Sequence, residues 1–298
     1  MNVWEQLKFI QESMENLKEY LENNLSAGTI KNYLYEIEKF KKNYKNPEKL
    51  NYQNLMQYVQ LLRKNYNPQS TNRTIYALKK YYDYLVETSQ IKYNPAQNIK
   101  IKDGKENPIQ LQELLTEKEL QQLLEPRKER YPILAKRNQI IMSLLVNQAL
   151  LVSDIERLKI EDLNLKNATI SIQKTGITNA RILNLKADQI LLFYQYLEED
   201  RIELEREKTS FFLLNKLASR ITNDDINYLI STYQKSFTKK ITSVKIRQSV
   251  IKLKLDQGEN LRKVQNFAGH KHADTTEKYR ETGIEALQSA INQYHPIR

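Results

Sequence analysis

Four stretches in the first hundred residues carry apolar side chains three and four positions apart. This spacing places them on one face of an α-helix, so each stretch predicts an amphipathic helix. The breaks fall at residues 26–29 and before Pro47 and Pro68, since proline disfavours helix in the preceding residue. The fourth helix is expected to begin at a capping residue, Ser70, Thr71 or Asn72. The first apolar stripe consists of Leu7, Ile10, Met14, Leu17, Tyr20 and Leu21.

The pattern changes after residue 110. Thr116 with Glu119 has the form of a capping box and opens a helix. Buried helices are expected from Ile133 to Leu145, continuing toward Val152, and again from Asp188. Between them, residues 168–172 alternate apolar and polar, residues 174–176 contain a turn glycine, and residues 181–185 alternate again. This alternation predicts a β-hairpin within a mostly helical domain.

The two patterns indicate two domains. A length of 298 residues exceeds what one hydrophobic core usually organises. The region around residues 101–110 lacks periodicity and contains Gly104 and Pro108, as a linker does. We therefore expect a mainly α protein: a helical bundle over 1–100, a linker over 101–110, and a mostly helical domain with a small β-sheet over 111–298.

Composition supports long helices and excludes several chemistries. Only 6 Gly and 7 Pro interrupt the chain, and 40% of the residues are hydrophobic. No run approaches the roughly 20 apolar residues of a membrane span, and the first residues have no signal-peptide form. The absence of Cys excludes disulfides, thiol catalysis and Cys-based zinc sites, and it fits a cytoplasmic protein.

The charge balance favours a polyanionic partner. The chain has 47 Lys and Arg against 36 Asp and Glu, a net charge of +11. Between Leu229 and Arg280 there are 12 basic residues against 4 acidic ones. Solvated helix faces explain most lysine-rich stretches, but they account poorly for an excess concentrated in one segment.

Candidate chemistry lies in that basic segment. Tyr279 follows His270 by nine residues, a Gly-His step precedes it, and Arg247 lies further upstream. A tyrosine can store a phosphoryl link as an ester, and a guanidinium can clamp the phosphate. In these residues the sequence resembles the tyrosine recombinase (phage integrase) family.

The resemblance implies a role for four residues. Lys174, at the hairpin turn, occupies the position of the general-acid lysine, and Arg247 that of the second arginine of the catalytic set. His270 would hydrogen-bond the scissile phosphate, and Tyr279 would be the nucleophile. The alternatives are a solvated turn lysine, a surface arginine, a structural histidine and a packed tyrosine. Their order along the chain favours the catalytic interpretation over these alternatives.

Two positions depart from the family pattern. The family reads approximately Thr-Gly-Leu-Arg-x-Ser-Glu where this chain has residues 148–154, so Leu151 replaces the first arginine. Val244 replaces the histidine of the His-x-x-Arg box. Losing a preorganised cationic donor costs about a hundred- to thousandfold in rate. We considered three substitute cations, Arg157, Lys159 and Lys245.

The N-terminal bundle resembles the core-binding (SAM-like) domain of the same family, which clamps DNA mainly through backbone phosphates. Lys31, Arg73, Lys79 and Lys80 are therefore candidate DNA-binding residues. This half of the chain also holds 12 of the 19 Tyr, which at helical spacing are more often core residues than nucleic-acid contacts. A short amphipathic helix after Gly283 either docks into a neighbouring protomer, as in relatives, or packs on its own domain.

Our first hypothesis is a site-specific DNA recombinase or integrase that cleaves and rejoins strands through a 3′-phosphotyrosyl intermediate. It would need no cofactor or metal, would bind double-stranded DNA as a dimer to tetramer, and would be nucleoid-associated in the cytoplasm, away from membranes. The second is a catalytically impaired DNA-binding protein that assists or regulates an active partner. A generic basic RNA-binding protein leaves the order of the four groups unexplained.

Overall fold

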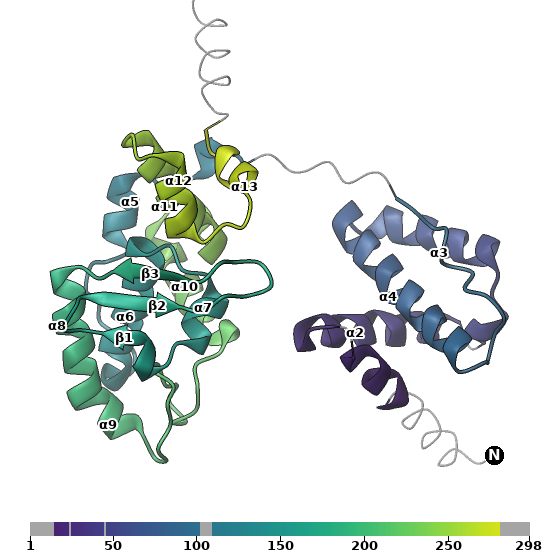
Figure 1. Ribbon diagram of the computed structural model, residues 1–298, viewed down its shortest axis with the longest axis horizontal. Helices are drawn as coiled ribbons and strands as arrows, with labels where there is room; N and C mark the ends of the chain where they lie inside the picture. Colours follow the sequence, from purple (N-terminus) through teal and green to yellow (C-terminus); the bar gives the residue numbers. More distant parts are fainter. Residues whose placement is uncertain (1–14, 24, 45, 102–108, 281–298) are drawn as a thin grey trace, which may run out of the picture. The chain divides into compact units, whose positions relative to one another are not determined.

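The computed structural model describes residues 15–23, 25–44, 46–101 and 109–280, and its contacts divide the chain into two units (Figure 1). The first unit spans Met1–Asn107 and the second spans Pro108–Arg298. The division falls inside the expected linker. Each unit is described below by itself.

The N-terminal unit is helical throughout its described elements, as the apolar spacing predicted. A helix over residues 15–22 is followed by α2 (Ala27–Asn43), α3 (Tyr52–Asn65) and α4 (Pro68–Glu87). α4 packs against both α2 and α3. Of the first predicted stripe, Leu17 and Leu21 are buried, whereas Leu7, Ile10 and Met14 lie outside the described residues.

Tyrosines of this unit divide between core and surface. Four are buried, and Tyr58 and Tyr82 pack around Phe40 with ring centroids 5.1 and 6.3 Å away. Others remain exposed, among them Tyr35 and Tyr76. The core interpretation is therefore correct for one group only. The buried tyrosines are Tyr58, Tyr81, Tyr82 and Tyr84.

The expected start of the fourth helix is wrong by several residues. Asn67 is its N-cap, its side chain accepts a hydrogen bond from the Ser70 N–H, and Pro68 occupies the first turn. Proline is well suited to this position, because it has no N–H to leave unpaired and its φ is already helical. Pro68 therefore opens α4 as well as ending the stretch before it.

The C-terminal unit combines helices with one small antiparallel sheet. The predicted hairpin is confirmed as β2 (Thr169–Ile172) and β3 (Arg181–Asn184), and a two-residue strand, β1 (Leu163–Asn164), adds an edge that the sequence did not predict. The helices are α5 (Glu117–Gln122), α6 (Ala135–Asn147), α7 (Val152–Arg157), α8 (Ala187–Gln195), α9 (Arg201–Leu204), α10 (Asn223–Thr232), α11 (Ser243–Asp256), α12 (Leu261–Ala268) and α13 (Ala273–Glu277).

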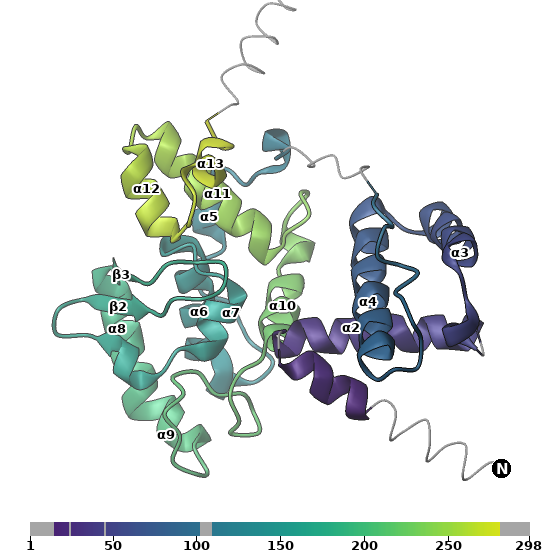
Figure 2. The same cartoon turned by 45° about the vertical axis from the view of Figure 1, so that its right-hand side comes forward.

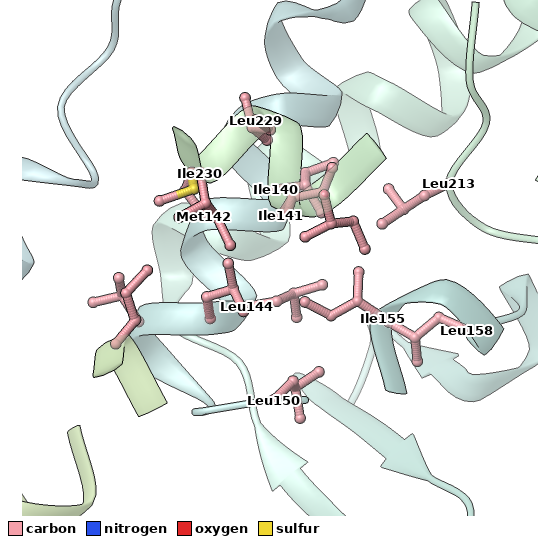
Figure 3. Close-up of a cluster of buried hydrophobic side chains, with 14 of the residues drawn as sticks. Ile140, Ile141, Met142, Leu144, Leu150, Ile155, Leu158, Leu213, Leu229 and Ile230 are labelled. Atoms are coloured by element: carbon pink, nitrogen blue, oxygen red, sulfur yellow. The ribbon is translucent and has the colours of Figure 1, made fainter. Parts of the chain in front are cut away.

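The core of this unit is centred on α6. Figure 3 shows side chains of α6, such as Ile140 and Leu144, near Ile155 of α7, Leu229 of α10 and Leu213. The buried helices predicted between Ile133 and Val152 are α6 and, after a short break, α7. The break between them contains Ala149, which adopts the left-handed conformation with φ +49°.

The basic segment folds into the last three described helices. α12 contacts α11, α13 and β3, and Figures 1 and 2 both show α11, α12 and α13 together at one end of the unit. The predicted capping box at Thr116 is confirmed at the start of α5. Gly258, after α11, has a positive φ. Among the described helices, none is long and apolar enough to cross a membrane.

The β1–β2 turn offers a stability prediction. Ala168 has φ +53° and is partly exposed, so its Cβ is strained while its methyl group buries little surface. Ala168→Gly should therefore stabilise the protein by about 1 kcal/mol, because glycine adopts this conformation without a steric cost. Ala180→Gly, at an exposed position without positive φ, should destabilise it instead. Denaturant titration of both variants measures this, and equal shifts would contradict it.

Candidate active site

Arg247 lies inside the fold, although a surface arginine was the alternative. It is on α11, is 7% exposed, and donates hydrogen bonds to the carbonyl oxygens of Ala149 and Ala268. Burial and, to a smaller extent, the charge of Arg181 lower the pKa of Arg247 to about 10. The guanidinium thus remains charged at neutral pH, between the α6–α7 break and the end of α12.

His270 follows α12 immediately. Gly269 ends that helix in the left-handed conformation, φ +69°, and His270 is buried with its Nδ1 2.8 Å from Thr276 Oγ1. Burial lowers the pKa of His270 to about 4, and the charges of Arg247 and Arg181 contribute to the lowering. The imidazole is therefore neutral at neutral pH and can donate or accept a single hydrogen bond at its other nitrogen.

Tyr279 comes just after α13 and packs beside His270. Their rings are nearly parallel, at 11°, with centroids 6.4 Å apart. The tyrosine is 7% exposed and belongs to a small cluster with Ile251 and Val264. Burial raises the pKa of Tyr279, while Arg247 and a hydrogen bond with Gln248 oppose the rise. Three of the four predicted site residues thus lie in one neighbourhood.

The fourth predicted site residue is Lys174. It is exposed on the β2–β3 loop, and none of the hydrogen bonds or ion pairs among the described residues involves it. Residues 176 and 179 of the same loop form hydrogen bonds with the segment that contains His270. The Asn179 N–H donates to the Gly269 oxygen at 2.9 Å, and Lys271 Nζ donates to the Gly176 oxygen at 2.6 Å.

Each of the three candidate substitute cations pairs with a carboxylate. Arg157 pairs with Asp154 at 3.1 Å, Lys159 with Glu161 at 3.2 Å, and Lys245 with Glu113 at 2.5 Å. Leu151 caps α7 without a side-chain hydrogen bond, and Val244 is exposed on the first turn of α11.

Sequence reasoning missed Arg181 and Asp154. Arg181 begins β3, and its buried side chain pairs at 3.0 Å with the fully buried carboxylate of Asp154. Alternation along β3 contains the signal, because Arg181 falls on the same face as the buried Leu183. An arginine on the inward face of a strand needs a buried partner, yet Asp154 lies 27 residues away and local patterns do not identify it.

The DNA-binding candidates all lie on α2 and α4 of the N-terminal unit. Lys31 is exposed, and Lys79 lies over the ring of Tyr76, 5.7 Å from its centroid. Lys80 is 4.0 Å from Asp83. Arg73 pairs at 2.9 Å with Glu36, a buried carboxylate that also accepts a hydrogen bond from Thr74. Arg73 therefore has a structural role whatever else it binds.

A resident metal has no evident place in the described part of the chain. No group of three or more His, Cys, Asp or Glu side chains there could hold an ion. The charged group that acts on Tyr279 is the guanidinium of Arg247, which repels cations and attracts anions. The chemistry of this neighbourhood is that of an anion site with a phenol beside it.

Known proteins resemble the chain over nearly its whole length. Residues 113–284 match the family described as "Phage integrase family", and residues 14–89 match "Phage integrase, N-terminal SAM-like domain". The tyrosine recombinase XerD of Listeria innocua is 28% identical over 290 residues, covering 93% of this chain and 95% of the relative. Tyrosine recombinase XerC of Bacillus pumilus is 27% identical over 295 residues, covering 93% and 94%.

Solved structures share the fold at lower identity. A XerH site-specific recombinase bound to its difH substrate, a pre-cleavage complex, aligns with a TM-score of 0.68 at 21% identity, covering 87% of this chain and 79% of that one. A lambda integrase dimer bound to a COC′ core site aligns at 0.64 and 14% identity, covering 91% and 76%. The family match extends over more than half of the chain and includes Arg247, His270 and Tyr279. The chain therefore belongs to the phage integrase family, the tyrosine recombinases.

Proposed function

We propose that the protein is a site-specific DNA recombinase that cleaves and rejoins strands through a 3′-phosphotyrosyl intermediate. The observation that carries this proposal is the meeting of a buried guanidinium, a neutral imidazole and a phenol, Arg247, His270 and Tyr279, from three successive elements. Relatives named tyrosine recombinases align over 93% of the chain, which supports the same reaction. The substrate is double-stranded DNA, bound by a homo-oligomer of two to four copies.

Each group has a defined part in the cleavage step. Tyr279 Oη attacks the phosphorus, so that the Oη–P bond forms while the P–O5′ bond breaks. The phenol releases its proton to water, and O5′ takes one from Lys174 acting as general acid. Arg247 and a hydrogen bond from His270 stabilise the negative charge that builds up on the phosphate oxygens. Attack by a 5′ hydroxyl on the tyrosyl ester reverses the step and rejoins the strands.

A second function stays in consideration for a specific reason. Leu151 and Val244 stand where the family pattern has a cation and a proton-transfer group, and the guanidinium of Arg247 already donates to two backbone carbonyls. These features favour slow cleavage. The alternative is a DNA-binding accessory or regulatory protein built on the recombinase scaffold.

A nicked suicide duplex separates the two functions. When the strand has a nick next to the scissile phosphate, the short leaving fragment diffuses away and the tyrosyl ester accumulates. The recombinase should give a covalent protein–DNA band that resists denaturation by detergent. Tight binding without any covalent band, on duplexes carrying the protein's own recombination site, would instead establish the accessory function.

Salt dependence tests the DNA contacts of the N-terminal unit. The logarithm of the affinity should fall linearly with the logarithm of the salt concentration, with a slope of about 0.9 per phosphate contact. Lys31→Gln should reduce this slope by the amount expected for about one phosphate contact, because Lys31 is exposed and its proposed role is to bind a phosphate. Lys64→Gln, exposed on α3, is the matched control and should leave the slope unchanged. Equal slopes for all three proteins would contradict the assignment of Lys31.

A further inference from the structure

The cluster around Arg247 contains more positive charge than its carboxylate neutralises. The cluster contains three guanidiniums. Asp154 forms ion pairs with two of them, Arg157 and Arg181, and the charge of Arg181 acts on the third, Arg247. The charge of Arg181 lowers the pKa of Arg247 more than the charge of Asp154 raises it. Buried like charges are costly unless an anion joins them. The excess therefore suits a bound anion.

Arg181 lies against the Gly269–His270 step. Its guanidinium lies so close to Gly269 that a Cβ built there would be 2.6 Å from Arg181 Nη1. His270 is the next residue, and Thr178, three positions before Arg181, forms a β-bridge with it. Only glycine at 269 allows both the positive φ and this approach. The fold thus brings the β3 cation against the Gly-His step.

The side chain of Arg181 is also incompletely satisfied. It is 4% exposed, its Nη2 pairs with Asp154, and its Nη1 is 3.4 Å from the Asn179 oxygen. Its Nε is buried and has no hydrogen-bond partner. This unpaired buried donor costs about 1 to 3 kcal/mol.

We propose that Arg181 supplies the second positive charge of the reaction centre, in place of the guanidinium that the family pattern has at position 151. This inference rests on the proposed function. Arg181 does not need to touch the substrate: its positive charge acts across Gly269 through the protein interior, where charges are weakly screened. This charge lowers the energy of the dianionic phosphate in the transition state. Asp154 fixes its side chain.

Substrate charge gives a readout that structural damage does not produce. Arg181→Gln removes the charge but keeps a donor for Asp154, so the fold should survive. Its cleavage of the nicked phosphodiester should fall about a hundredfold, the typical cost of losing one preorganised donor. A methylphosphonate at the scissile position has lost one negative charge, so on it the variant should lose much less. Arg181→Lys keeps the charge and should retain most of the phosphodiester activity.

Arg201→Gln is the matched control. Arg201 is buried, pairs with Glu205 at 3.1 Å, and also has an unpartnered Nε. Its variant should lose stability without changing the ratio of the two cleavage rates. If Arg181→Gln instead loses the same factor on both substrates, or if Lys is no better than Gln, Arg181 is structural and the inference fails. If the wild-type protein gives no adduct, the proposed function itself fails, and that result is distinct.

Discussion

Tyr279→Phe should abolish the covalent protein–DNA adduct completely. The variant lacks the oxygen that forms the bond to phosphorus. Phenylalanine fills the same space among Ile251 and Val264, so the packing is retained. Stability should fall by about 1 kcal/mol through the lost hydrogen bond with Gln248. DNA affinity should not change.

The measurement is adduct formation on the nicked duplex, read on a denaturing gel beside a binding isotherm. Tyr233→Phe is the matched control, because Tyr233 has the same 7% exposure as Tyr279 and lies in the same unit. It should form the adduct at the wild-type rate. A covalent band that persists in Tyr279→Phe would show that another residue attacks the phosphate, and the assignment of the nucleophile would be wrong.

Local patterns account for most of the fold. Period-two alternation located β2 and β3, and apolar spacing located α2, α3 and the later helices, because each of these signals depends only on neighbouring residues. The start of α4 was misplaced because proline serves both to end one helix and to open the next. The strand β1 is only two residues long, which is too short to show an alternation of apolar and polar residues.

The candidate site was predictable only where the resemblance supplied positions. Arg247, His270 and Tyr279 meet as expected, since the order of the motifs specified them. The pair Arg181–Asp154 joins a strand to a helix far along the chain, and no local period connects the two residues. A basic residue on the inward face of β3 was the available signal. The surface cations proposed as substitutes are all held by nearby acids, which composition does not reveal.

Leu151→Arg should raise the rate of adduct formation about a hundred- to thousandfold, the inverse of the usual cost of deleting a cationic donor. The structure around position 151 should tolerate an arginine. Leu151 makes no side-chain capping bond that would be lost, and Ala149, two residues before it, already holds Arg247. Leu191→Arg, at an exposed site on α8, adds the same charge elsewhere and should leave the cleavage rate unaltered. No gain in Leu151→Arg, in a folded protein, would contradict the prediction.

The size of this gain should depend on Arg181. If both guanidiniums serve the same phosphate, Leu151→Arg compensates more in the Arg181→Gln background than in the wild-type protein, so the two changes are not additive. An additional guanidinium at position 151 also increases repulsion with Arg247 and Arg181 in the DNA-free protein, so its thermal stability should fall while DNA binding restores it. Equal rate factors in both backgrounds would show that the charges at positions 151 and 181 do not act on the same phosphate.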